Sequence, residues 1–155
     1  MLRSSLHRAT IHFVRDLRDD DFRRLLEFRD GLRRFLHWSE EQAKAVGLTT
    51  AQHQLLLSIR GHPGDTAPTV RDVASHLLLR HHSAVELIDR AQAIGLVERT
   101  IDPLDHRVVR LGLTAEGRRR LSALTAQHLE ELARLEPQLR PIWEGLTSGD
   151  AGRSR

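Results

Sequence analysis

Apolar residues in the first third of the chain recur at steps of three and four, the period of an amphipathic helix. The longest such stripe begins after Asp21 and ends at Gly47, a residue type that commonly terminates helices. Its members are Phe22, Leu25, Leu26, Leu32, Phe35, Leu36, Ala43 and Val46. Phe28 and Trp38 lie outside this stripe, so the helix is predicted to have a second apolar face that a partner subunit covers.

Three shorter helical patterns follow. The first spans residues 49–61 and starts at a threonine. The second starts at Thr69, three residues before Asp72, a spacing related to the capping box in which two side chains satisfy free N–H groups. The third has Ala84, Val85, Leu87, Ile88 and Ala91 as its apolar positions and stops at Gly95. Because about three residues separate the last two patterns, they are predicted to form a helix-turn-helix.

Two short runs after Gly95, LVERTI and VVRLGL, are rich in β-branched and aliphatic residues. The segment DPLDHR between them has the proline and aspartates that favour turns, so the chain is predicted to form two antiparallel strands around a charged loop, a wing. Helical periodicity resumes at Thr114. Pro137 is predicted to start a separate final helix through Leu146, because a proline in a first turn forfeits no helical hydrogen bond.

The composition narrows the class of protein. A chain of 155 residues with 39% hydrophobic content can bury the core of one domain. The absence of cysteine excludes disulfides and thiolate metal sites, and a reducing cytosol permits it. No apolar run reaches about 18 residues, the length of a membrane span. We therefore expect a soluble, cytoplasmic protein without membrane contact.

The charge is compatible with nucleic acid without requiring it. The net charge is +3, and all 24 cationic residues except Lys44 are arginine. A guanidinium group matches phosphate and guanine edges better than an ammonium group does. A GC-rich genome also replaces lysine with arginine, so this feature alone leaves the partner open.

Four segments resemble those of MarR-type winged helix-turn-helix transcriptional regulators in order and spacing: LTTAQHQLLLSI, TVRDVASHL, SAVELIDRAQAIGLVER and DPLDHRVVRLGLTAEG. The resemblance runs from about Phe22 to Leu146. The last segment is similar to the family's wing signature of two aspartates, an arginine and a closing LT..G. Glu86 and His106 depart from it, since many members carry arginine at both positions.

The resemblance implies a mainly α fold with a small β wing, a winged helix-turn-helix flanked by N- and C-terminal dimerisation helices. The predicted units are an arm at residues 1–20, a regulator domain at 21–146 and a disordered tail at 147–155. Within the domain, residues 49–113 are the predicted DNA-binding part, and 21–47 and 114–146 the dimerisation helices. The implied function is that of a homodimeric repressor on a pseudo-palindromic operator in double-stranded DNA, released by a small aromatic or anionic ligand.

His81 and His82 stand at the start of the predicted second helix of the helix-turn-helix. Adjacent helical residues point about 100° apart, so the pair is poorly placed for one metal ion, and His82 for activating Ser83 as a nucleophile. Residues at this position face DNA in helix-turn-helix proteins, and a merely solvated surface is the alternative. The predicted DNA contacts are Arg71, Arg80, His81, His82, Ser83, Glu86, Asp105, His106 and Arg107.

Local structural roles compete with DNA contact at several of these positions. Ser83 and Glu86 have the spacing of a capping box. Arg107 follows Asp105 by two residues, so the carboxylate can fix its guanidinium at the hairpin tip. The resemblance implies that this arginine enters the minor groove, and a structural ion pair is the alternative. Asp102 is predicted to cap the turn. Two local ion pairs are also predicted, Arg90 with Asp89 and Arg99 with Glu98.

Apolar residues of the terminal helices have two interpretations, core or binding surface. The predicted ligand-pocket residues are Phe35, His37 and Trp38. The predicted dimer surface comprises Phe28, Trp38, Leu139, Ile142 and Trp143.

Two further functions stay open as alternatives. One is a winged-helix module for protein interaction or non-specific DNA binding. The other is a zinc-responsive regulator that uses His53, His62, His128 and a carboxylate, although no compact ligand motif supports it. No glycine-rich phosphate loop or catalytic constellation indicates an enzyme, and no cofactor or resident metal is expected.

Overall fold

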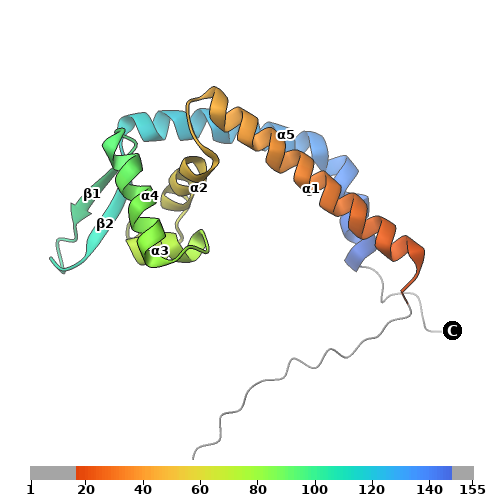
Figure 1. Cartoon of the computed structure of the whole chain (residues 1–155), viewed down its shortest axis with the longest axis horizontal. Helices are drawn as coiled ribbons and strands as arrows, with labels where there is room; N and C mark the ends of the chain where they lie inside the picture. The colour runs from red at the N-terminus through yellow and green to blue at the C-terminus, as the bar shows by residue number, and fades with distance from the viewer. Residues whose placement is uncertain (1–16, 148–155) are drawn as a thin grey trace, which may run out of the picture.

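The computed structural model describes residues 17–147; most of the predicted arm and tail lies outside them. The elements are α1 (Asp19–Ala45), α2 (Thr50–Arg60), α3 (Val70–His76), α4 (His81–Ala93), β1 (Val97–Ile101), β2 (Val109–Leu113) and α5 (Ala115–Thr147). Figure 1 shows α2, α3, α4 and the β1–β2 hairpin gathered at one end, with α1 and α5 running side by side away from them. The predicted fold class, mainly α with a two-stranded antiparallel wing, is confirmed. Among the described helices, none combines the length and apolarity needed to cross a bilayer.

Threonine side chains start three of the helices, as the sequence predicts. Thr49 accepts a hydrogen bond from the backbone N–H of Gln52, and Thr69 from that of Asp72. Gln52 and Asp72 return the contact to the threonine backbone N–H, which completes two capping boxes. Thr114 caps α5 through the backbone N–H of Gly117.

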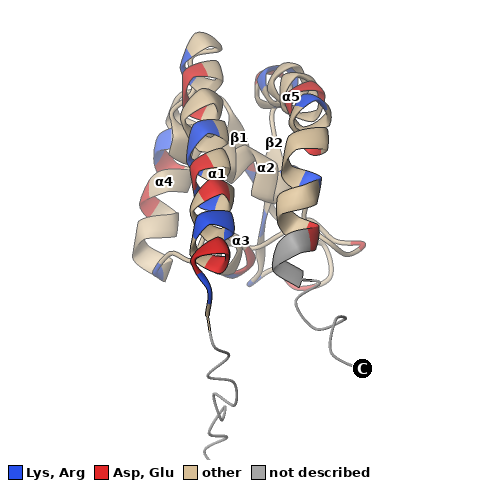
Figure 2. Ribbon diagram, turned by 90° about the vertical axis from the view of Figure 1, so that its right-hand side faces the viewer, with Lys and Arg blue, Asp and Glu red and all other residues tan. Residues whose placement is uncertain are grey.

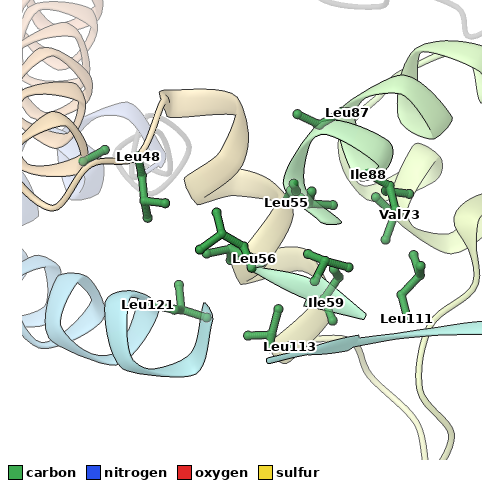
Figure 3. Packing of buried hydrophobic residues seen from close by; sticks show 14 of the residues in the cluster. Leu48, Leu55, Leu56, Ile59, Val73, Leu87, Ile88, Leu111, Leu113 and Leu121 are labelled. Carbon is green, nitrogen blue, oxygen red and sulfur yellow. The ribbon is translucent and has the colours of Figure 1, made fainter. Parts of the chain in front are cut away.

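The hydrophobic core surrounds α2. Leu55 and Leu56 of this helix are fully buried. Figure 3 shows that side chains of α3, α4, β2 and α5 converge on α2. They include Val73, Leu87, Ile88, Leu111, Leu113 and Leu121, all of which belong to one buried cluster. The helix-turn-helix and the wing thus share a core that one chain completes.

The C-terminal helix is continuous, so the predicted break at Pro137 is wrong. Pro137 and Pro141 both lie inside α5. Each proline removes one backbone hydrogen bond from a helix. Contact with α1 extends past both, because the rings of Phe28 and Trp143 are 5.8 Å apart. This tertiary contact stabilises the last turns where the local pattern predicts a new start.

Before Ala43, the two apolar faces of α1 are used in the opposite sense from the prediction, whereas Ala43 and Val46 of the main stripe join the core. Phe28, Phe35 and Trp38, two of them outside the main stripe, turn toward α5 and contact Trp143 and His128. Phe22 and the four leucines of the main stripe are between 47% and 58% exposed. They are Phe22, Leu25, Leu26, Leu32 and Leu36, called the α1 stripe below. Aromatic rings offer a larger area for packing than leucine side chains, which favours their face for the contact within the chain.

Candidate nucleic-acid interface

The start of α4 differs from those of α2 and α3 because no side chain caps it. Arg80 is the N-cap residue, and its side chain makes no capping hydrogen bond. The capping box that was the alternative role of Ser83 and Glu86 does not form, since Ser83 lies in the third position of the helix. Glu86 instead lies 4.0 Å from Arg90 on the next turn. The free N–H groups of the first turn therefore give α4 an uncompensated positive end.

Exposed cationic and imidazole side chains lie at this end of α4. Arg80, His81 and His82 are exposed, and Ser83 is half-buried. Arg71 is exposed on the neighbouring helix α3. Within residues 17–147 the guanidinium groups of Arg71 and Arg80 make no hydrogen bond or ion pair. They are thus available to a partner outside the chain.

Other arginines of this region are held within the protein, but not by the neighbours predicted from sequence. Arg99 of β1 contacts Asp89 of α4 at 2.6 Å and also Gln92. Arg90 pairs with Glu86. Adjacent residues on a helix or strand point in different directions, whereas i,i+4 positions and neighbouring elements bring charges together.

The wing tip presents Arg107 in a fixed orientation. Asp105 accepts two hydrogen bonds from its guanidinium, from Nε to Oδ1 and from Nη2 to Oδ2, both at 3.0 Å. Asp105 also accepts from the backbone N–H of Arg107. These bonds lower the pKa of Asp105 and raise that of Arg107. The Arg107 side chain is 90% exposed, and His106 beside it is exposed as well.

A second ion pair, which the sequence analysis missed, fixes the base of the wing. Asp102 caps the turn as predicted, because its Oδ1 accepts from the backbone N–H groups of Leu104 and Asp105. Its Oδ2 lies 2.8 Å from Nε of Arg110, which lowers the pKa of Asp102. Arg110 also donates to the backbone carbonyl of Ala67, ahead of α3. The sequence signal for this ion pair is Arg110 itself, a charged residue in a strand whose other residues are apolar.

The closing LT..G of the wing segment attaches α5 to the end of α4. The hydroxyl of Thr114 donates to the carbonyl of Gly95 at 2.6 Å. A Cβ atom at Gly117 would lie 2.1 Å from the carbonyl oxygen of Leu96, so only glycine permits this approach. Gly95 has a φ of 74°, which also favours glycine. This part of the segment is therefore structural.

The charges of α1 do not form a cationic surface of the same kind. Figure 2 shows Lys or Arg and Asp or Glu following one another along α1. Arg23 pairs with Asp20, and Lys44 with Glu40. Arg29 and Arg34 of α1 are also exposed without an ion pair within residues 17–147, so α1 differs from the start of α4 in the acidic side chains that lie between its cations.

A cavity of about 840 Å³ lies between α1, α2 and α5, next to the winged unit. Phe35 and His37 of the predicted pocket line it. Trp38 lines a different cavity of about 480 Å³ between α1 and α5, which Phe35 also borders. The structure therefore does not bring all three predicted residues to one cavity.

Two histidines in the wall of the larger cavity were not predicted as ligand-site residues. His53 of α2 and His128 of α5 have ring centres 4.8 Å apart. His128 Nδ1 lies 2.8 Å from the carbonyl of Leu124, which can only accept, so Nδ1 carries a proton. In the neutral ring, Nε2 then accepts from the hydroxyl of Ser39 at 2.6 Å. Burial of His53, together with the charge of His128, lowers the pKa of His53.

The structure separates the histidines of the zinc alternative. His62 lies beside His76, with 3.1 Å between Nδ1 and Nε2, whereas His53 and His128 contact each other. In the described part of the chain, no group of three or more histidine and carboxylate side chains is arranged to hold a metal ion. The set of His53, His62 and His128 is therefore wrong.

Comparison with known proteins agrees with this geometry. Residues 46–108 match the model of the MarR family. YsmB of Bacillus subtilis (strain 168), an uncharacterized HTH-type transcriptional regulator, is 34% identical over 79 residues, which are 51% of this chain and 49% of YsmB. The match thus spans about half the length of that relative.

Solved structures share the fold. A mutant of S. aureus MepR bound to oligodeoxyribonucleotide has a TM-score of 0.60 at 22% identity, over 78% of this chain and 91% of that chain. CouR from Rhodococcus jostii RHA1, bound to p-coumaroyl-CoA, has a TM-score of 0.60 at 25% identity, over 82% of this chain and 92% of that chain.

The helix-turn-helix, the hairpin and the shared core define a winged helix-turn-helix protein. Residues 46–108 of this unit match the MarR family model, so the chain is similar to the winged helix-turn-helix transcriptional regulators of that family over this unit.

Proposed function

We propose that the chain is a dimeric, sequence-specific DNA-binding regulator that represses transcription until a small ligand releases it. Residues 49–113 form its DNA-binding part, and residues 21–47 and 114–146 its dimerisation helices. It acts in the cytoplasm and has no enzymatic activity. The MepR structure, with its bound oligodeoxyribonucleotide, is the relative that supports DNA as the partner.

The uncapped start of α4 is the observation that carries this proposal. Threonine side chains cap the starts of α2 and α3. Helix α4 instead begins with free N–H groups beside exposed cationic and imidazole side chains. Such an end binds phosphate and fits the major groove, where recognition helices place their first residues. The proposed contacts are Arg71, Arg80, His81, His82, Ser83 and Glu86. Glu86 is suited to accept a hydrogen bond from cytosine N4.

The wing supplies the second part of the proposed interface. The guanidinium of Arg107, oriented by Asp105, is proposed to enter the minor groove, whose narrow form attracts arginine. His106 is exposed beside it and is proposed to contact the flanking backbone. Hydrogen bonds from Arg110 to Asp102 and to Ala67 hold the wing against the segment ahead of α3.

A second copy of the chain is proposed to cover the α1 stripe. One winged unit reads one half-site, and two-fold dimers place two recognition helices about 34–36 Å apart on a pseudo-palindrome. The residues first predicted for the dimer surface pack partly within the chain, since Phe28 contacts Trp143 and Trp38 contacts His128. The α1 stripe, which stays exposed, is therefore the better candidate.

The larger cavity is the proposed ligand site. It lies where the terminal helices meet α2, so an occupant contacts both α1 and the winged unit. Its wall combines apolar side chains such as Phe35 and Leu36 with the imidazoles of His53 and His128. This chemistry suits a small aromatic or anionic ligand. CouR, a relative bound to p-coumaroyl-CoA, supports an aromatic acid derivative as the class to test.

Fluorescence anisotropy with DNA from upstream of the chain's own gene tests the proposal. Wild-type protein should stay bound in an excess of scrambled competitor DNA. Replacing His81 and His82 together with alanine should weaken specific binding by about 1–3 kcal/mol per lost contact. The melting temperature should not change, because both side chains are exposed.

The control is His37→Ala, which removes an exposed histidine of α1 and should bind as the wild type does. Displacement of the wild type by scrambled DNA would support the non-specific alternative instead. A double variant that melts several degrees lower and keeps its operator affinity would assign the two histidines a structural role.

A further inference from the structure

A pair of imidazoles joins the segment after α2 to the last turn of α3. His62 follows α2, and His76 is the last residue of α3. Nδ1 of His62 lies 3.1 Å from Nε2 of His76, and the rings are nearly perpendicular, at 82°. Within the described residues neither ring has another hydrogen-bond partner. The two nitrogen atoms therefore face each other from separate elements of the fold.

The geometry points to a divalent transition-metal site formed by His62 and His76. Without metal, a nitrogen–nitrogen contact of this length needs one N–H group and one lone pair, so a single proton lies between the rings. A metal ion can replace that proton and take a lone pair from each ring. Metal–nitrogen bonds of about 2.0–2.1 Å at angles of about 90–110° separate two such nitrogens by about 2.9–3.4 Å. The observed separation lies in this range, so the rings need to turn toward a shared ion but need not change their separation.

The ligand chemistry selects the class of ion. Imidazole suits Zn²⁺, Cu²⁺ and Ni²⁺, whereas Mg²⁺ and Ca²⁺ prefer oxygen, and the chain has no cysteine for softer ions. Asp72 lies one helical turn before His76; hydrogen bonds from Thr69, and to a smaller extent the charge of His62, lower the pKa of Asp72. The field of this carboxylate favours a cation at the pair. Water completes the coordination, because the described residues hold no group of three ligands.

A bound ion would cross-link the first helix of the helix-turn-helix to the segment that precedes it. The site lies apart from the wing tip and from the larger cavity, whose histidines are His53, His128 and His37. It does not depend on the proposed DNA or ligand binding, and metal binding can be measured with the free protein.

Zn²⁺ titration followed by ¹⁵N–¹H correlation spectra of the histidine rings tests this site in the full chain. Signals of His62 and His76 should shift together, saturating at one ion per chain, with the largest changes at Nδ1 of His62 and Nε2 of His76. Removing a residue that only hydrogen-bonds to a metal ligand lowers metal affinity about 10- to 100-fold. Removing a ligand itself, in His62→Ala or His76→Ala, should therefore lower the Zn²⁺ affinity at least about ten-fold. Cu²⁺ should bind more tightly than Zn²⁺.

His37→Ala and the variant with both His81 and His82 replaced by alanine are the controls, and both should keep the site. Circular dichroism should show that His62→Ala and His76→Ala fold, since neither ring belongs to the buried core. Shifts confined to other histidines, or an affinity that survives both substitutions, would overturn the assignment. A shift of only one of the two rings would also overturn it, because the site requires both.

Discussion

The winged unit and the long helical pair use their apolar residues differently. In α2, four of 11 residues are buried, and Leu55, Leu56 and Ile59 among them belong to the core on which other elements converge (Figure 3). In α1, one residue of 27, Ala43, is buried. The five members of the α1 stripe stay about half exposed although they have the helical period of a packed face.

This difference indicates which part of the protein is complete in one chain. The winged unit has a closed core, side-chain caps at the starts of α2 and α3, and a wing held by Asp102 and Arg110. In the α1–α5 pair, only the face of α1 that carries the aromatic residues packs within the chain. The other face leaves a contiguous exposed apolar stripe, and such a stripe marks an interaction surface.

The largest expected effect is loss of stability in the core of the winged unit. Leu56→Ala removes a fully buried side chain, and large-to-small changes of this type cost about 2–5 kcal/mol because a cavity remains. Leu26→Ala, in the α1 stripe, makes the same chemical change at a side chain that is 56% exposed. Urea unfolding at low protein concentration should show a much smaller loss for Leu26→Ala. Equal losses would contradict the proposed division between the two regions.

Local sequence signals predicted the parts of the fold that depend on neighbouring residues. Thr49, Thr69 and Thr114 were recognised as helix starts because a cap contacts N–H groups two or three positions away. The turn of Asp102 and the contact of Asp105 with Arg107 also lie within a few residues. Both strands of the wing are predicted by their β-branched and aliphatic residues and by the turn residues between them.

Features set by tertiary contacts were missed or assigned incorrectly. The periodicity of α1 gave two apolar faces, but only the position of α5 decides which one packs. Pro137 indicated the start of a new helix, because the sequence around it gives no sign of the contact between Phe28 and Trp143. The pair of His53 with His128 joins helices far apart in sequence. The pair of Asp102 with Arg110 spans eight residues of one hairpin, a separation that no helical spacing rule reports.

Charge placed on the α1 stripe should separate the copies of a dimer while leaving the chain folded. Leu32→Glu puts a carboxylate on the stripe twice in a two-fold dimer, and burial of unpaired charge is strongly unfavourable. Sedimentation should show a dissociation constant raised at least about ten-fold, which corresponds to about 1.4 kcal/mol. Ile94→Glu, at the exposed end of α4, is the control and should remain a dimer. Unchanged sedimentation of Leu32→Glu would place the dimer surface elsewhere.

Arg107→Ala should weaken DNA binding without affecting folding or assembly. The side chain lies outside the core and is 90% exposed. Loss of this contact should reduce the free energy of DNA binding by about 1–3 kcal/mol, most of all where the flanking minor groove is A·T-rich. The dependence of binding on salt concentration should also become shallower. Asp105→Ala should cause a smaller loss, because the arginine stays but is no longer held. Anisotropy titrations on the natural operator and on one with G·C flanks measure both, and wild-type affinity of Arg107→Ala would remove the wing from the interface.

The smallest effect concerns His53, where the two regions meet. Burial lowers the pKa of His53 below its ordinary value of 6.5. The unfolded chain therefore binds a proton more readily than the folded chain, so the free energy of unfolding rises with pH up to about 6.5 and falls as the pH drops below it. His53→Gln removes this proton and should make the melting temperature decline less between pH 7 and pH 5.

The slope of stability with pH, rather than stability itself, identifies His53 as the titrating group, because the substitution also changes packing at a buried position. His37→Gln is the matched control, since His37 lines the same cavity with an exposed side chain. It should keep the wild-type slope. If His53→Gln and the wild type decline equally, the proton is taken up elsewhere, and the contact of His53 with His128 would join the two regions without making their junction sensitive to pH.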